Sequence, residues 1–164
     1  MFPVFFDLSN LHVMLIGGGM GALHRLRQLE DNGAASVKIF AEAPIPELEI
    51  LSRNRLTRNL PTAGDFVGAS IIFITDTDMH FAERFAMRAR AMHIPVNVEG
   101  VSSLSDFFVP ASSRQRELIM SVSKVAAQPI LARRLKKYLH EKPEPRVRGV
   151  FGAFTEYFRQ REAE

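Results

Sequence analysis

A glycine cluster directly after a short apolar run is the feature of this sequence with the clearest chemical meaning. Val13–Ile16 is followed by Gly17, Gly18, Gly19, Met20, Gly21 and Ala22. Gly17, Gly19 and Ala22 fit the pattern G-x-G-x-x-A, in which glycines permit a tight turn and close approach to a pyrophosphate. The N–H groups at the start of the following helix would attract the phosphate charge. The motif predicts a dinucleotide-binding turn, and the alternative is a glycine-rich turn with a purely structural role.

An acidic side chain follows the next apolar run at the spacing that such a turn requires. A dinucleotide site places an acid at the end of the second strand, roughly 20 residues further on, where it bonds the ribose hydroxyls. Glu42 follows Val37–Phe40 and occupies this place. Its carboxylate would favour NAD over NADP, because it repels an added phosphate. Glu42 as an exposed loop acid is an equally good interpretation.

Further polar residues lie near the ends of two later apolar runs. Thr75, Asp76 and Asp78 follow a β-branched run, and Asn97 lies near the end of another. Parallel sheets bind ligands at the carboxyl ends of their strands, so we expect these residues near the cofactor. Asp76 as a simple cap of the following helix is the alternative.

No residue pattern in the sequence indicates hydrolytic chemistry or metal binding. The five histidines show no metal-ligand spacing, there is no cysteine, and Ser121 and Ser123 lack a nucleophile-elbow context. We therefore predict no metal site, and no catalytic residue is assigned.

The elements that must position these residues alternate between strands and helices. Strands are predicted at 13–16, 37–40, 69–75, 94–98 and 117–123, and helices at 20–31, 45–53, 79–92 and 129–140. In the third helix, Phe81, Phe85 and Met92 are predicted to share one stripe. The alternation predicts an α/β fold: a Rossmann-type doubly wound parallel sheet over residues 1–110. A small region at 111–142 and a linker with a C-terminal helix at 143–164 follow, and Phe151, Phe154 and Phe158 form an apolar stripe in that helix.

Composition restricts the function classes. The chain has 164 residues, of which 46% are hydrophobic and 24% charged, and a formal net charge of +3. No apolar run approaches the roughly 20 residues needed to cross a bilayer, and no signal peptide is recognisable, so we expect a cytoplasmic protein. Basic residues cluster at Arg133, Arg134, Lys136 and Lys137. They form either an anion site or a solvated helix face, and the absence of interleaved aromatics argues against nucleic acid.

The order of the motifs resembles the precorrin-2 dehydrogenase/sirohydrochlorin ferrochelatase family, the N-terminal module of sirohaem synthases. The matching segments run from residue 2 to about 140 and comprise residues 2–8, 13–19, 29–34, 74–76, 96–98, 106–111 and 129–135. Of these, Asp106–Ala111 and Pro129–Leu135 are specific to this family rather than to Rossmann domains in general.

The resemblance implies an NAD-binding Rossmann domain and a small dimerisation region. Family members oxidise precorrin-2 to sirohydrochlorin with NAD, and some then insert iron. It also implies a homodimer and a tetrapyrrole whose carboxylates meet the basic cluster. By position, Met20 and Gly21 would meet the cofactor phosphates, and Glu42 and Ala43 would lie beside the adenosine ribose. The expected cofactor-binding residues are Gly17, Gly18, Gly19, Met20, Gly21, Ala22, Glu42, Ala43, Thr75, Asp76 and Asn97.

Two departures from the family fall on the substrate side. The family reads Asn-Val-Val-Asp, with an aspartate implicated in both reactions, where this chain has Asn97, Val98, Glu99 and Gly100. The family's Ser-Gly-Gly-x-Ser-Pro loop reads Ser-Lys-Val-Ala-Ala-Gln-Pro at 123–129. Two hypotheses follow: an NAD-dependent precorrin-2 dehydrogenase, weak and without ferrochelatase activity, or a non-catalytic member that binds NAD or a tetrapyrrole as a sensor, carrier or partner protein. Glu99 could replace the aspartate only if the strand has already ended before it.

Overall fold

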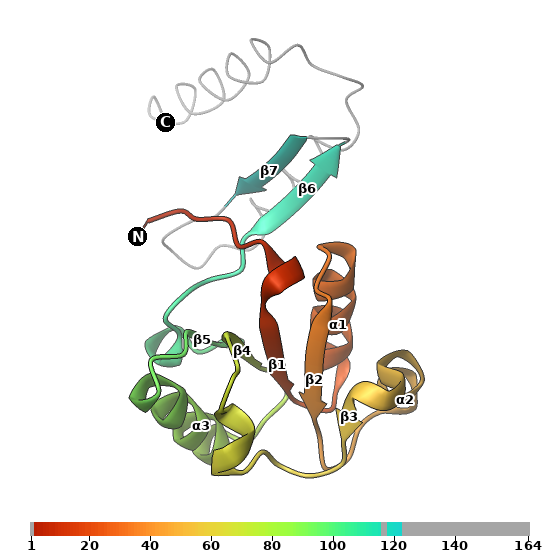
Figure 1. Cartoon of the computed structure of the whole chain (residues 1–164), viewed down its shortest axis with the longest axis vertical. Helices are drawn as coiled ribbons and strands as arrows, with labels where there is room; N and C mark the ends of the chain where they lie inside the picture. Colours follow the sequence, from red (N-terminus) through yellow and green to blue (C-terminus); the bar gives the residue numbers. More distant parts are fainter. Residues whose placement is uncertain (1, 116–117, 123–164) are drawn as a thin grey trace, which may run out of the picture. The chain divides into compact units, whose positions relative to one another are not determined.

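A five-stranded parallel sheet forms the centre of the N-terminal unit. The computed structural model describes residues 2–115 and 118–122, and the chain divides into two units, Met1–Phe108 and Val109–Glu164. The strands of the first unit are β1 (His12–Ile16), β2 (Ser36–Phe40), β3 (Leu56–Thr57), β4 (Ile71–Ile74) and β5 (Val96–Val98). They lie in the order β3-β2-β1-β4-β5 (Figure 1). The predicted doubly wound α/β fold is confirmed.

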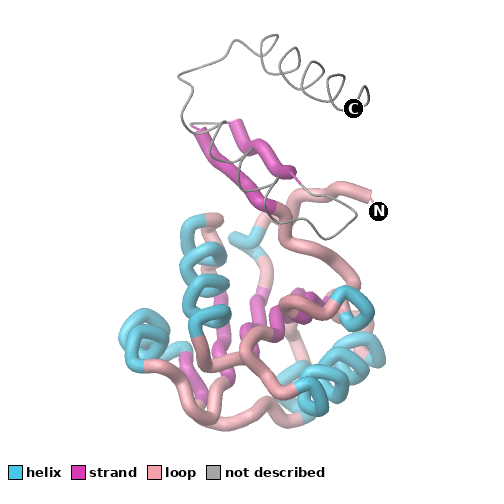
Figure 2. The backbone as a smooth tube through the Cα atoms, turned by 180° about the vertical axis from the view of Figure 1, so that it is seen from behind, coloured by secondary structure: helices cyan, strands magenta, loops and turns pink. Residues whose placement is uncertain are grey.

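Helices cover both faces of this sheet. The helices are α1 (Met20–Asp31), α2 (Pro46–Ser52) and α3 (Met79–Ala91), and Figure 2 shows them from behind. Leu15 of β1 and Phe73 of β4 belong to a core with α1 and α2, whereas Ile16 and Ile74 belong to a second core with α3. Alternate strand residues thus enter opposite cores, which explains why these strands read as continuous apolar runs.

The strand order reverses between β1 and β4. From β1 the chain runs through β2 to β3 at one edge, and then returns to the other side of β1 to form β4 and β5. Val13 of β1 lies in register with Val37 on one side and with Ile71 on the other. The carboxyl ends of β1 and β4 therefore lie side by side at the position where sheets of this kind bind ligands.

Most predicted elements are present, some with shifted ends. Two predicted strands are too long, one short strand was not predicted, and one residue was assigned to the wrong stripe. The residues 69–70 and 94–95 lie outside β4 and β5, because these strands pair only over Ile71–Ile74 and Val96–Val98. Strand β3 was not predicted, since two residues carry no periodicity. Met92 does not belong to the buried stripe of α3: it is 38% exposed, and Ala82, Ala86 and Ala89 are buried beside Phe85 instead.

The described part of the second unit is an antiparallel hairpin of β6 (Ala111–Gln115) and β7 (Leu118–Val122). Strand β7 matches the strand predicted at 117–123, whereas β6 was not predicted, because its sequence is mostly polar. The predicted helix at 129–140, the substrate-side loop at 123–129, the basic cluster, the linker and the Phe151 stripe lie outside the described residues. No described helix is long and apolar enough to span a membrane.

Candidate functional site

The glycine turn is held between the ends of three neighbouring strands. The N–H of Gly17 donates to the carbonyl of Phe40 in β2 (2.9 Å), and the N–H of Thr75 after β4 donates to the carbonyl of Ile16 in β1 (2.8 Å). Gly17 has φ +145°, and a Cβ there would lie 2.2 Å from the Thr75 carbonyl oxygen. Only glycine fits this position, so the sheet itself dictates the first glycine of the motif.

The N–H donors at the start of α1 form two groups, one that is already hydrogen-bonded and one that has no partner among the described residues. The N–H groups of Gly21 and Ala22 donate to the two carboxylate oxygens of Asp76, at 3.2 and 2.7 Å. Within the described part of the chain, the N–H groups of Gly18, Gly19 and Met20 make no hydrogen bond. These three donors lie at the positive end of the helix dipole, which favours an anion. The turn therefore keeps three N–H donors that could meet an anion, although Asp76 occupies those of Gly21 and Ala22.

Asp76 caps α1 rather than the helix that follows it in sequence. The alternative of Asp76 as a cap of α3 is wrong: Asp78 is the N-cap of α3 and accepts from the N–H of His80. Asp76 adopts φ +47°, a left-handed conformation that aspartate tolerates better than most residues. Asp76 lies just beyond the end of β4, and its carboxylate reaches across to the start of α1.

Glu42 and Ala43 lie just beyond the carboxyl end of β2, and both are exposed. Glu42 makes no hydrogen bond or ion pair with any other described residue, so its carboxylate is available to a ligand. The carbonyl oxygen of Ala43 lies 2.8 Å from the position that a Cβ on Gly18 would take. The acid and the glycine turn therefore belong to one edge of the sheet, as a dinucleotide requires.

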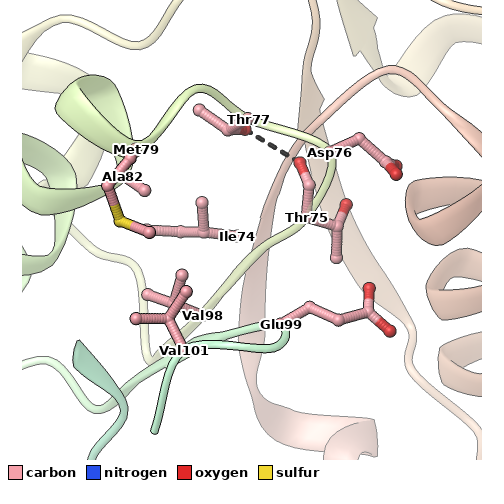
Figure 3. Close-up of a pocket in the computed structure, with 9 residues that line it drawn as sticks. All are labelled: Ile74, Thr75, Asp76, Thr77, Met79, Ala82, Val98, Glu99 and Val101. Carbon is pink, nitrogen blue, oxygen red and sulfur yellow. Dashed lines mark hydrogen bonds between the residues drawn. The ribbon is translucent and has the colours of Figure 1, made fainter. Parts of the chain in front are cut away.

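A small open pocket lies beside the turn, at the carboxyl ends of β4 and β5 (Figure 3). Its lining residues are Ile74, Thr75, Asp76, Thr77, Met79, Ala82, Val98, Glu99 and Val101. The Thr75 hydroxyl is buried and has no hydrogen-bond partner among the described residues. Asn97 lies elsewhere: its Nδ2 donates to the Phe107 carbonyl (2.9 Å), and its side chain does not line the pocket.

Two charged residues beside the pocket were not singled out as a pair by the sequence. Glu99 follows β5 directly, and its Oε1 lies 3.9 Å from Nη2 of Arg25 in α1. The Arg25 guanidinium lies over the Phe73 ring, with its Cζ 5.2 Å from the centroid. Burial lowers the pKa of Arg25, and the nearby Glu99 charge opposes that shift. A charged residue in an amphipathic helix normally faces water, so no sequence signal marks Arg25 as buried.

Gly100, which stands where the family resemblance implies an aspartate, has no side chain to offer. It adopts φ +77°, and a Cβ there would meet no other atom within 4 Å. The described residues include no group of three or more histidine, cysteine or acidic side chains that could hold a metal ion.

The fold and the site together define a dinucleotide-binding domain of the Rossmann class. A family model described as "Putative NAD(P)-binding" matches residues 4–111. The chain belongs to this family, and the predicted cofactor, NAD, agrees with it. The three N–H donors of the turn and the exposed Glu42 fit the phosphates and the ribose of such a cofactor.

Similar proteins extend the resemblance beyond the cofactor domain. The chain is 35% identical over 136 residues to a siroheme synthase of Methylococcus capsulatus, covering 82% of this chain and 29% of that protein. It is 31% identical over 162 residues to a siroheme synthase of Thiobacillus denitrificans, covering 97% of this chain and 33% of that protein. The chain thus spans about a third of the length of these relatives.

A solved structure described as SirC, precorrin-2 dehydrogenase, shares the fold, with a TM-score of 0.70 at 21% identity. The match covers 98% of this chain and 78% of that one. The family resemblance inferred from the motifs is confirmed.

Proposed function

We propose that the chain oxidises precorrin-2 to sirohydrochlorin with NAD. The observation that carries the proposal is the glycine turn, which keeps three N–H donors for a pyrophosphate beside a pocket lined by Asp76 and Glu99. The names of the similar proteins, siroheme synthase and precorrin-2 dehydrogenase, supply the substrate. When bound, NAD supplies the hydride acceptor.

The residues of the chain bind and orient the reactants. The donors of Gly18, Gly19 and Met20 would hold the phosphates, and the carboxylate of Glu42 would hold the adenosine ribose. Asp76 fixes the start of α1 through Gly21 and Ala22, so that these donors stay in place. Holding a hydride donor and acceptor at contact distance contributes much of the rate of such a reaction.

A second function is favoured by one observation. Gly100 offers no carboxylate where the family resemblance implies one, which fits a non-catalytic member that binds NAD or a tetrapyrrole as a sensor, carrier or partner protein. For the same reason, the enzyme that we propose would oxidise precorrin-2 without inserting iron.

The two functions predict different outcomes in one anaerobic experiment. The purified full chain is incubated with precorrin-2 and NAD, and sirohydrochlorin and NADH are followed together. Catalysis gives the two products in equal amounts, and a Gly100→Asp variant would run faster. Measurable binding of NAD and precorrin-2 without either product would contradict the enzyme and support the binding protein.

The biological setting is part of the same proposal. We propose a cytoplasmic homodimer, with the N-terminal 110 residues as the cofactor domain and residues 111–142 contributing to the dimer and the tetrapyrrole side. The basic cluster at Arg133–Lys137 would meet the substrate carboxylates. Light scattering coupled to size exclusion tests the dimer, and a monomer at working concentration would contradict it.

A further inference from the structure

Glu99 lies at the point where β5 ends and its side chain leaves the sheet. Its N–H donates to the carbonyl of Ile74 (2.9 Å), which extends the pairing with β4 by one residue. The side chain then points to α1: its Oε2 lies 2.8 Å from the position that a Cβ on Gly21 would take. Although this hydrogen bond continues the pairing by one residue, β5 itself ends at Val98, and the Glu99 carboxylate faces the glycine turn.

Two carboxylates thus approach one point, but they differ in what they can still accept. Asp76 Oδ1 and Oδ2 lie 2.9 and 3.0 Å from that same position on Gly21, and Figure 3 shows both acids extending to the same side of the pocket. Both oxygens of Asp76 already accept backbone N–H groups. Glu99 accepts no hydrogen bond from any described residue, and its side chain is 49% exposed. Of the two acids, Glu99 is the one whose oxygens are open to a proton.

Arg25 holds Glu99 in this orientation. Its side chain is 10% exposed, and its Nη2 lies 3.9 Å from the Glu99 carboxylate. Its Nη1 donates to Gln28 (2.8 Å), while its buried Nε has no partner among the described residues. The buried cation lies beside Glu99, and its attraction favours the orientation in which the carboxylate points to α1.

We propose that Glu99 is a catalytic residue that accepts the proton released in the oxidation, an inference that rests on the proposed function. One C–H bond of precorrin-2 breaks and its electron pair leaves as hydride to NAD⁺, giving NADH. A second hydrogen leaves as a proton, and its bonding electrons become part of the new double bond of the macrocycle. Glu99 takes this proton and releases it to water, so that two electrons and two hydrogens are accounted for.

Replacing Glu99 by glutamine tests the role, with Glu83→Gln as the matched control. Glu83 is an exposed residue of α3 whose side chain does not line the pocket. Loss of a general base lowers kcat by roughly a hundred- to ten-thousand-fold, so Glu99→Gln should fall in that range while Glu83→Gln matches the parent chain. NAD affinity, measured by calorimetry, should not fall, because none of the groups proposed to hold NAD is changed.

The pH profile separates catalysis from a structural role. In the parent chain, kcat/KM should rise with pH on its acid side as the base loses its proton, and this limb should disappear in Glu99→Gln. Among the described residues, Arg25 and Asp76 are the charged side chains that face Glu99, and both are retained in the variant. Glu99→Asp should recover part of the rate.

Three outcomes would overturn the proposal. Glu99→Gln with nearly parental turnover removes Glu99 from catalysis but leaves the proposed function standing. Loss of NAD binding in Glu99→Gln, in parallel with turnover, assigns the residue a structural role. No turnover by the parent chain removes the proposed function, and the role of Glu99 falls with it.

Discussion

Asp76 connects β4 to the start of α1, and replacing it should destabilise the fold by a predictable amount. Its carboxylate accepts from the N–H groups of Gly21 (3.2 Å) and Ala22 (2.7 Å). A capping carboxylate contributes about 0.5–2 kcal/mol, and its charge at the helix N-terminus adds about 0.5 kcal/mol. Because Asp76 is exposed, water replaces part of what is lost, so removing the carboxylate should cost about 2 kcal/mol.

Different substitutions of Asp76 separate the loss of its carboxylate from the strain of its left-handed backbone. At φ +47°, alanine adds strain of about 1 kcal/mol, whereas glycine adds little. We therefore expect losses in the free energy of unfolding of about 3 kcal/mol for Asp76→Ala and about 2 kcal/mol for Asp76→Gly. Asp76→Asn keeps one acceptor oxygen and tolerates the conformation, so its loss should be about 1 kcal/mol.

Urea unfolding at neutral pH measures these differences, provided that the dependence on urea is the same in all variants. If all three variants unfold like the parent chain, Asp76 does not hold α1 in place. If alanine is as stable as glycine, the left-handed backbone of Asp76 carries no strain. Either result would contradict the role assigned to Asp76.

Three further predictions concern the turn, the cofactor and pH. Gly17→Ala should cost about 3 kcal/mol or more, because its Cβ meets the Thr75 carbonyl at 2.2 Å, whereas Gly33→Ala, which meets open space at φ +81°, should cost about 1 kcal/mol; equal losses in urea unfolding would contradict the clash. Glu42→Ala should weaken NAD binding and strengthen NADP binding several-fold by calorimetry, and an unchanged preference would remove Glu42 from the ribose site. The hydrogen bond from Lys38 holds the pKa of Asp65 down at about 2, below its ordinary 3.8. The stability that the ionised Asp65 gives the fold is therefore fully present above the ordinary pKa and is lost as the pH falls toward 2. Since this pair lies at the surface, Asp65→Asn should cost about 1 kcal/mol at neutral pH and nothing in strong acid, as measured by thermal unfolding; a difference independent of pH would contradict the prediction.

The sequence predicts the long elements well, because their apolar positions repeat strongly. Helix α1 has the predicted bounds, Met20–Asp31, since the glycine turn precedes it and Asn32-Gly33 ends it. Strand β3 could not be predicted, because only its pairing with Ile39 and Phe40 makes Leu56 and Thr57 a strand. Strand ends are likewise fixed by partners and not by composition.

The candidate site could likewise be predicted from the sequence only in part. The positions of the glycine turn, Glu42 and Asp76 at one sheet edge follow from chain order, because parallel strands bring their carboxyl ends together. The bond from Ala22 to Asp76 joins residues that lie 54 positions apart, and no local pattern specifies it. The direction of Glu99 depends on where β5 ends, and the burial of Arg25 depends on Phe73. These features could be found only in the folded structure.

Every role assigned to the pocket depends on a dinucleotide lying across the glycine turn. Amide chemical shifts of the full chain, recorded by two-dimensional NMR during titration with NAD, test this directly. The largest shifts should fall on Gly18, Gly19 and Met20, while Gly21 and Ala22, whose N–H groups bond Asp76, should move less. Shifts confined to another part of the chain, or no shifts at saturating NAD, would contradict the account.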